Sequence, residues 1–306
     1  MTDVAVLLPS EAVRSAVEPL PGEPPARVWN PGVERPEGME ETTFWVPPFL
    51  AGPEISATIA DLPELRVVQL MTAGADAFVD RMPAGVLLCD ARGVHTSSTS
   101  EWVVTVLLAD AREIPDFVRA QDARRWTQRV TGELAGRRVL VLGAGAIGEG
   151  VRARLAPFDV EVTMVARRAR DGVHAVEELP ALLPRADAVV VLLPLTDATR
   201  GLVGAELLAA MPDGALLVNA ARGPVVDTDA LFAELRSGRL RAAVDVTDPE
   251  PLPADHPLWG APGLLLTPHV AGSVSGFPAR AARLVAAQLR RYLAGDDLHN
   301  VVADGY

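Results

Sequence analysis

The stretch Arg138-Val-Leu-Val-Leu-Gly143-Ala-Gly145-Ala-Ile-Gly148 decides the fold of this chain. The apolar run before Gly143 is typical of a buried strand, and a helical pattern over Ala146–Ala156 follows. In this context the three glycines serve a tight turn, a close approach of the backbone to a pyrophosphate, and helix–strand packing. The helix N-terminus adds free N–H groups and a positive dipole end. A plain glycine-rich turn would need no such flanking elements, so we predict a dinucleotide-binding domain.

The composition limits the classes of protein to which the chain could belong. Its 306 residues suffice for about two domains, and its formal net charge of −12 argues against nucleic acid or a membrane surface as the main partner. The single cysteine, Cys89, excludes a disulfide framework and a cysteine-based metal site, and we expect no metal. Because no signal-like start and no apolar stretch of roughly 18 residues is present, we expect a cytoplasmic protein.

The first hundred residues predict a small parallel α/β domain. Five short apolar runs are typical of strands, the pattern at Glu11–Val17 is typical of a helix, and proline-rich connections separate them. The predicted strands are Val4–Leu8, Arg27–Trp29, Thr43–Val46, Leu65–Leu70 and Val86–Leu88.

The second domain is predicted to span residues 99–276. Thr99 and Ser100 are placed to cap a long apolar helix over Trp102–Ala111. Six strand patterns alternate with helical ones, which predicts a doubly wound sheet of the Rossmann type. The last helix, Pro278–Ala294, lies beyond this sheet and is predicted to return to the first domain, which then consists of residues 1–98 and 277–306. The six strands are Val139–Leu142, Val160–Val165, Ala188–Leu193, Ala215–Val218, Arg241–Asp245 and Leu264–Leu266.

The end of the second strand of this sheet bears on the choice of dinucleotide. An NAD site usually places Asp or Glu there, about 20 residues past the first glycine, to bind the ribose 2′-hydroxyl. Here Ala166 stands at that position, and Arg167 and Arg168 follow. A missing carboxylate and two guanidinium groups both favour a 2′-phosphate. We predict a preference for NADP(H), with NAD(H) as the alternative if the arginines are only solvated surface charges.

Three later stretches each follow a predicted strand. They are Asn219–Gly223, Asp245–Pro251 and Thr267–Ala271. Because the carboxyl ends of parallel strands meet at one edge of an open α/β sheet, where ligands bind, we expect these stretches to lie together. Between them they supply a cation, a carboxylate and an imidazole.

With these motifs the sequence resembles the D-isomer-specific 2-hydroxyacid dehydrogenases, of the kind that reduce glyoxylate or hydroxypyruvate. The resemblance covers nearly the whole chain. It implies a Rossmann domain and a smaller, discontinuous, flavodoxin-like α/β substrate domain. It also implies a homodimer formed through the cofactor domain. The motifs that carry it are Thr99–Glu101, Gly143–Gly148, Leu193–Thr196, Thr199–Arg200, Asn219–Gly223, Asp245–Pro251, Thr267–His269, Tyr292–Gly295 and Asn300–Val302.

The resemblance implies the reduction of a small 2-oxo acid to a D-2-hydroxy acid by three catalytic residues. Arg222 would hold the substrate carboxylate and carbonyl oxygen through parallel hydrogen bonds. His269 would donate a proton to that oxygen as hydride arrives from the nicotinamide, which suits imidazole near neutral pH. Glu250 would orient His269 and favour its protonated form.

The family pattern also implies the residues that contact the cofactor. Ala146 and Ile147 would present backbone N–H groups to the pyrophosphate, and Asp245 would face the nicotinamide. The full predicted set is Gly143, Gly145, Ala146, Ile147, Gly148, Arg167, Arg168, Pro194, Thr199, Ala220, Asp245 and Ala271.

The first domain offers weaker candidates for substrate binding. The turn after the strand Leu65–Leu70 resembles the family's carboxylate-binding turn, and the N–H groups near Ala73 and Gly74 could cup an anion. Trp45 either lines the pocket for the substrate's side chain or packs in the core. The other histidines are interpreted as packed or surface residues, and His95 is the least certain of them because it lies near the domain junction.

Other functions stay open at this point. A dinucleotide-sensing binding protein on the same fold would bind the cofactor tightly without turnover, and a phosphite-type dehydrogenase could use the same arginine and histidine. Glu250 disfavours a formate dehydrogenase, which carries glutamine there, and a methyltransferase would leave the later strand-end motifs without a role. Glyoxylate, hydroxypyruvate and bulkier 2-oxo acids all fit the sequence.

Overall fold

The computed structural model describes residues 4–20, 22, 24–49 and 51–302, and the chain divides into two compact units. The first unit combines Met1–His95 with Ser275–Tyr306, and the second is Thr96–Val274. The domain boundaries predicted from the sequence, after residues 98 and 276, lie three and two residues later than the boundaries in the structure, after His95 and Val274. Among the described residues, no helix is both long enough and apolar enough to cross a membrane.

The first unit is built on a parallel sheet of five strands in the order β2-β1-β3-β4-β5. This is the strand order of flavodoxin, as the flavodoxin-like prediction requires. Each strand is short, and side chains alternate between the faces, so that Phe44 packs under the helices and Trp45 packs on the opposite face. The strands are β1 (Val6–Leu8), β2 (Ala26–Val28), β3 (Phe44–Trp45), β4 (Val67–Gln69) and β5 (Leu87–Cys89).

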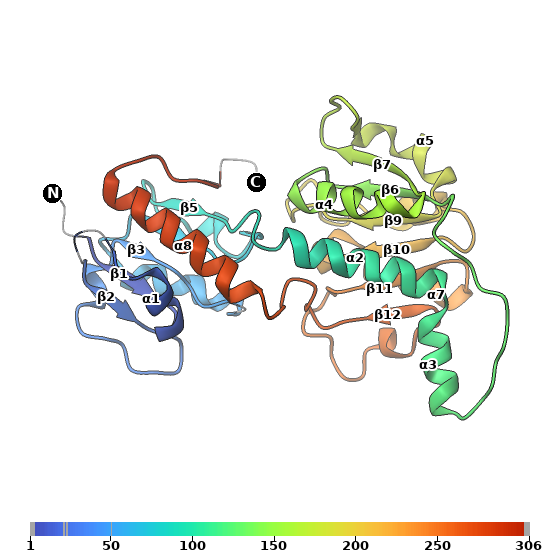
Figure 1. Cartoon of the computed structure of the whole chain (residues 1–306), viewed down its shortest axis with the longest axis horizontal. Helices are drawn as coiled ribbons and strands as arrows, with labels where there is room; N and C mark the ends of the chain where they lie inside the picture. The colour runs from blue at the N-terminus through green and yellow to red at the C-terminus, as the bar shows by residue number, and fades with distance from the viewer. Residues whose placement is uncertain (1–3, 21, 23, 50, 303–306) are drawn as a thin grey trace. The chain divides into compact units, whose positions relative to one another are not determined.

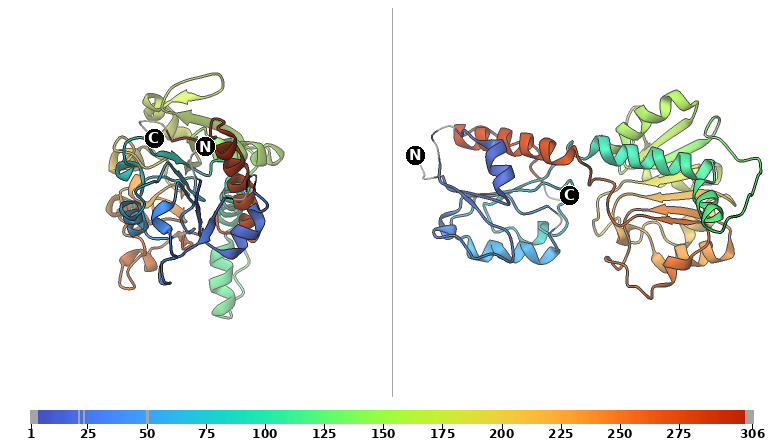
Figure 2. Two further views of the ribbon diagram at one scale, coloured as in Figure 1. Left: turned by 90° about the vertical axis from the view of Figure 1, so that its left-hand side faces the viewer. Right: turned by 60° about the horizontal axis from the view of Figure 1, so that its bottom comes forward.

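Helix α8 (Phe277–Ala294) completes the first unit, although it lies at the far end of the sequence. It packs beside α1 (Glu11–Val17) over one face of the five-stranded sheet (Figures 1 and 2). Its buried stripe, including Val285 and Leu289, joins Val17 and the strands in one apolar core. The predicted return of the last helix is therefore confirmed, and the first domain is discontinuous.

The second unit contains a parallel sheet of seven strands in the order β12-β11-β10-β9-β6-β7-β8. Strand order reverses between β6 and β9, which is the switch point of a doubly wound sheet. The predicted six strands are present, and His174–Ala175 adds a seventh at the edge that is too short to give a sequence pattern. The strands are β6 (Arg138–Leu142), β7 (Glu161–Ala166), β8 (His174–Ala175), β9 (Ala188–Val191), β10 (Leu216–Asn219), β11 (Arg241–Val244) and β12 (Leu264–Leu266).

Helices cover both faces of this sheet. Buried side chains of α2 and α4 join one apolar core, and those of α5, α6 and α7 join the other. The near-continuous burial of the strands follows from this two-sided cover. The helices are α2 (Thr96–Ala111), α3 (Ile114–Asp122), α4 (Ala146–Leu155), α5 (Leu179–Leu182), α6 (Ala205–Ala210) and α7 (Thr228–Ser237).

Helix α2 begins earlier than the sequence predicted. It starts at Thr96, so Thr99 and Ser100 lie inside the helix and do not cap it. The Ser100 hydroxyl donates to the carbonyl of Thr96 (2.5 Å), one turn back, which is the alternative that serine and threonine have to capping. The predicted cap was therefore wrong, because the hydroxyl of a serine inside a helix can donate a hydrogen bond to a backbone carbonyl of the same helix.

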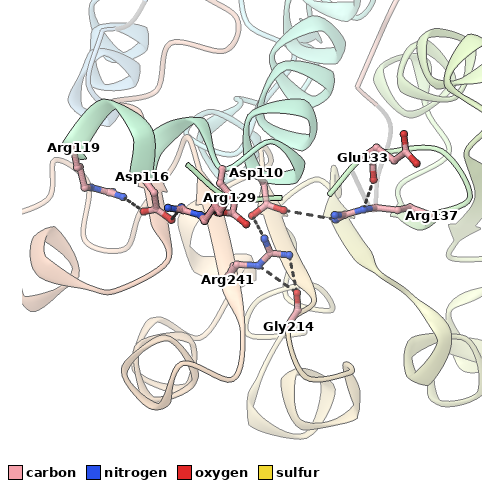
Figure 3. A network of polar contacts seen from close by, with 9 residues as sticks. Asp110, Asp116, Arg119, Arg129, Glu133, Arg137, Gly214 and Arg241 are labelled. Carbon is pink, nitrogen blue, oxygen red and sulfur yellow. Dashed lines mark hydrogen bonds and ion pairs between the residues drawn. The ribbon is translucent and has the colours of Figure 1, made fainter. Parts of the chain in front are cut away.

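A polar cluster ties α2 to the amino ends of the strands in the second unit (Figure 3). Arg241, the first residue of β11, pairs with Asp110 of α2 at 2.7 Å and donates to the carbonyl of Gly214 at 2.8 Å. Arg137 approaches the other oxygen of Asp110 at 3.8 Å. Burial raises the pKa of Asp110 above its ordinary value, although the two arginines act in the opposite direction. The cluster lies at the end of the sheet opposite to the predicted ligand site.

Candidate active site

Three neighbouring strands end at one edge of the seven-stranded sheet and carry the three predicted catalytic residues. Strands β10, β11 and β12 lie side by side in register, with Asn219 beside Val244 and Val244 beside Leu266. Arg222 follows the first of these strands, Glu250 the second and His269 the third. Because adjacent parallel strands release the chain at the same edge, residues far apart in the sequence are gathered here.

The loop that presents Arg222 is shaped by the end of β10. Asn219 donates to the carbonyl of Arg222 (3.1 Å) and accepts from the N–H of Ala221 (3.1 Å), which closes a tight turn. The Arg222 guanidinium donates to the carbonyl of Ala221 (2.8 Å). A Cβ on Gly223 would lie 1.8 Å from the carbonyl oxygen of Thr247, so only glycine allows this loop to pack against the loop after β11.

His269 and Glu250 form a hydrogen-bonded pair. The Nδ1 atom of His269 lies 2.6 Å from Oε1 of Glu250, and each side chain is a little more than a third exposed. Because Nδ1 is engaged by the carboxylate, Nε2 is the ring atom that can exchange a proton with a ligand. The pair therefore has the geometry of a general acid with its orienting carboxylate.

The electrostatic surroundings keep Glu250 ionised. Partial burial on its own would raise the pKa of this carboxyl group, but three neighbours outweigh it: the hydrogen bond and charge of His269, the N–H of Thr247, and the positive charge of Arg222. The resulting pKa of Glu250 lies below its ordinary value. The carboxylate of Glu250 thus interacts electrostatically with both the imidazole and the guanidinium.

Asp245 holds the backbone of the loop that carries His269. Its buried carboxylate accepts hydrogen bonds from the hydroxyl of Thr267 (2.5 Å) and from the N–H groups of Val270 (2.9 Å) and Ala271 (2.8 Å). The carbonyl of Asp245 also accepts from the N–H of His269 (2.7 Å). These contacts retain His269 at φ 54°, a left-handed conformation that residues other than glycine rarely adopt. Its predicted contact with the nicotinamide stays a prediction beside this observed role.

The glycine-rich turn after β6 has the form that a dinucleotide requires. A Cβ on Gly148 would lie 2.0 Å from the carbonyl oxygen of Gly143, so the helix and the turn pack as closely as glycine allows. At Gly145 a Cβ would meet nothing within 4 Å, which leaves the backbone bare on that side. Helix α4 then begins at Ala146 with no side-chain cap on its first N–H groups. A pyrophosphate fits this bare, uncapped helix start.

The end of β7 carries three exposed arginines. Ala166 is the last residue of the strand, and Arg167 and Arg168 follow it at the surface. Arg170, which the sequence analysis did not single out, donates to the carbonyl of Ala144 in the glycine-rich turn (2.6 Å). This contact brings the segment after β7 next to the predicted dinucleotide site. Its position only two residues after Arg168 is the feature of the sequence that could have indicated Arg170 as a further candidate.

The remaining predicted cofactor residues lie in loops at the same edge of the sheet. The Thr199 hydroxyl donates to the carbonyl of Pro194 (2.6 Å), which closes the loop after β9. Ala220 directly follows β10, and Ala271 is buried in the loop after β12. Within the described part of the chain, no three His, Cys, Asp or Glu side chains gather in a way that could hold a metal ion.

Two predicted substrate residues, Ala73 and Gly74, lie in the first unit in the turn after β4. This turn is partly exposed, and the hydroxyl of Thr72 donates to the carbonyl of Gly74 across it (2.8 Å). Trp45, in contrast, has no exposed surface and packs against Phe78 in the core, with ring centroids 6.0 Å apart. Of the two interpretations of Trp45, the structure supports core packing.

Comparison with known proteins identifies the class. A family model described as "D-isomer specific 2-hydroxyacid dehydrogenase, NAD binding domain" matches residues 104–271. A glyoxylate reductase from Thermofilum pendens is 33% identical over 79% of this chain and 76% of its own length. The fold, the glycine-rich turn and these matches together define an NAD(P)-dependent oxidoreductase of 2-hydroxy acids.

Solved structures agree with this assignment over the whole chain. A D-isomer-specific 2-hydroxyacid dehydrogenase from Xanthobacter autotrophicus Py2, in complex with NADPH and MES, is 34% identical with a TM-score of 0.84, and 98% of each chain is covered. An NADPH-dependent glyoxylate/hydroxypyruvate reductase from Sinorhizobium meliloti, in complex with NADP and sulfate, is 26% identical with a TM-score of 0.83, again over 98% of each chain. The chain belongs to the D-isomer-specific 2-hydroxyacid dehydrogenase family, as its motifs predicted.

Proposed function

We propose that this chain is an NADPH-preferring reductase that converts a small 2-oxo acid, of the glyoxylate or hydroxypyruvate kind, into a D-2-hydroxy acid. The observation that carries the proposal is the His269–Glu250 pair, 2.6 Å apart, beside the charge of Arg222. A 2-oxo acid needs a proton donor, which an imidazole held by an ionised carboxylate provides. It also needs a cation that binds its carboxylate, which a guanidinium provides.

Each of these residues has one task in the proposed reaction. The guanidinium of Arg222 binds the substrate carboxylate and polarises the carbonyl oxygen. A nicotinamide dinucleotide bound at the glycine-rich turn would supply the hydride for the carbonyl carbon. Nε2 of protonated His269 gives its proton to the carbonyl oxygen, so that the carbonyl group becomes an alcohol, and Glu250 keeps the ring oriented and balances its charge. His269 then regains a proton from solvent before the next turnover.

The reaction is tested by NADPH and NADH oxidation with glyoxylate, hydroxypyruvate, pyruvate and phenylpyruvate. We expect turnover with at least one of these acids. The His269→Gln variant should lose turnover and keep its affinity for NADPH, because the imidazole acts on the substrate and not on the dinucleotide. The Arg222→Ala variant should lose both substrate affinity and rate. Unchanged turnover in His269→Gln would overturn the proton-donor assignment, and tight NADPH binding without turnover by the natural protein would favour a sensor.

The preference for NADPH is proposed to come from Arg167 and Arg168. They follow Ala166, where a carboxylate that would repel a 2′-phosphate is absent. Replacing both with alanine should raise KM for NADPH by about tenfold to a hundredfold, the effect of losing charge-assisted hydrogen bonds, and leave KM for NADH nearly unchanged. Arg185→Ala, at another exposed position of the same unit, is the control. Equal changes for both dinucleotides would contradict the assignment.

We further propose that a second copy of this chain covers the exposed apolar surface of α3 and the segment after it. Trp126 and Val130 are more than nine-tenths exposed, and Ile114 and Val118 are about half exposed. Apolar side chains at such exposure are typical of surfaces that are buried on association. Light scattering should give the mass of a dimer, and Trp126→Ser with Val130→Ser should shift the protein toward monomer. A monomeric natural protein would refute the proposal.

A further inference from the structure

His95 lies beside the turn that the sequence analysis predicted as a binding site for the substrate carboxylate. The side chain is 7% exposed and stacks nearly parallel to Phe277 at 5.1 Å and Phe49 at 5.8 Å between ring centroids. It is the last residue of the first unit before the chain enters the second, and Phe277 lies close to the point of return. Next to it, Arg280 donates to the carbonyl of Val94 (2.8 Å). The imidazole therefore packs against a pair of phenylalanine rings that also contact each other, with centroids 3.9 Å apart.

The imidazole of His95 holds one peptide group of the turn. Its Nε2 atom lies 2.9 Å from the carbonyl oxygen of Met71. A carbonyl oxygen can only accept, so Nε2 carries the proton and donates it. The next carbonyl, that of Thr72, accepts from the N–H of Ala91 (2.8 Å). Two successive carbonyls of the turn thus point toward the same segment, residues 91–95.

This arrangement determines where the N–H groups of the turn point. In a trans peptide the N–H is directed opposite to the carbonyl of the same group. The Met71–Thr72 peptide is not among the cis peptides of the described chain, so holding the Met71 carbonyl turns the N–H of Thr72 away from His95. Among the described residues, this N–H has no protein acceptor. A backbone N–H that points out of a turn in this way is a group that can contribute to an anion site.

We propose that His95 is a positioning residue for the substrate, which aims the N–H of Thr72 at the substrate carboxylate by holding the carbonyl of Met71. The inference rests on the proposed function, since it requires a 2-oxo acid as ligand. It assigns a role to a histidine that is buried and cannot itself touch the substrate, and it adds Thr72 to the predicted carboxylate turn.

The test compares two substitutions with opposite effects on the hydrogen bond. His95→Phe keeps an aromatic ring against Phe49 and Phe277 but removes the donor. His95→Gln, in contrast, retains an amide N–H that can reach the Met71 carbonyl. We expect His95→Phe to raise KM for the 2-oxo acid about 3- to 10-fold, the effect of one lost hydrogen bond, with kcat and the Kd for NADPH within about twofold of the natural protein. His95→Gln should restore most of the loss in KM.

A purely structural histidine would give a different result. If KM in His95→Phe stays unchanged, or if kcat, KM and the Kd for NADPH all worsen together with the melting temperature, the inference is overturned. Absence of turnover in the natural protein would instead overturn the proposed function. Should His95→Phe fail to fold, the amide NMR signal of Thr72 in the natural protein decides the question. With NADPH bound, added oxalate should shift this signal, and no shift would overturn the inference.

Discussion

Replacing Asp245 with asparagine should slow the reaction without removing any group that contacts a substrate. The carboxylate is 3% exposed and accepts three hydrogen bonds from the loop that carries His269. Asparagine has nearly the same shape, but one of its two polar atoms is a donor. At least one of the loop groups, either the hydroxyl of Thr267 or the N–H of Val270 or Ala271, must then face a donor or lose its partner.

The cost follows from burial and charge. A buried donor left without a partner costs about 1–3 kcal/mol, so a loss of about 2 kcal/mol is expected. His269 is held at φ 54° by this loop, and this conformation is unfavourable for a histidine. If the whole loss is expressed in the transition state, kcat for the 2-oxo acid falls about 30-fold, since 1.36 kcal/mol corresponds to a factor of ten. The Kd for NADPH should change much less.

Asp110→Asn is the matched control. Asp110 is also a largely buried aspartate of the second unit with several partners, but it pairs with arginines at the amino ends of the strands, opposite to the site. Steady-state kinetics and thermal unfolding of both variants should show a reduced kcat only in Asp245→Asn, whatever each does to the melting temperature. Full kcat in Asp245→Asn, or an equal loss of kcat in both variants, would refute the reasoning.

Three further outcomes are expected at other positions. Gly223→Ala should raise KM for the 2-oxo acid at least tenfold and lower the melting temperature, since a Cβ would lie 1.8 Å from the Thr247 carbonyl oxygen; normal kinetics would contradict this. Gly145→Ala should fold normally and weaken NADPH binding, because a Cβ at position 145 meets nothing within 4 Å. Gly148→Ala should destabilise the fold, because a Cβ at position 148 would lie 2.0 Å from the carbonyl oxygen of Gly143. Calorimetry measures the loss of NADPH binding, and dye-monitored melting measures the loss of stability. The pKa of Glu250 in the folded protein lies below the ordinary value of 4.5. The stabilisation that this carboxylate contributes is therefore complete above pH 4.5, and it is lost as the pH falls through the lower pKa of the folded state. A pH–rate profile should accordingly show no acid limb from Glu250 above pH 4.5.

Strand and helix patterns in the sequence carry enough information to bring the three predicted catalytic residues together. Helix α1 has the predicted bounds, Glu11–Val17, because apolar spacing and a serine cap agree there. The neighbouring positions of β10, β11 and β12 follow from the topology of a doubly wound sheet. Helix α3 was not predicted, because its start depends on the left-handed conformation of Glu113, which no local pattern indicates.

The sequence does not distinguish a polar residue that contacts a ligand from a polar residue that holds the backbone of the neighbouring loop. His95 and His269 are both histidines near strand ends, and Asp245 and Glu250 both follow β11. Burial separates them in the structure: His269 and Glu250 are more than a third exposed, whereas His95 and Asp245 are nearly buried and bond to backbone groups of the loops they support. A buried side chain cannot reach a substrate, so its effect must pass through geometry. Substituting Asp245 should therefore lower kcat, because it displaces the proposed proton donor. Substituting His95 should raise KM, because it reorients the turn that is predicted to bind the carboxylate.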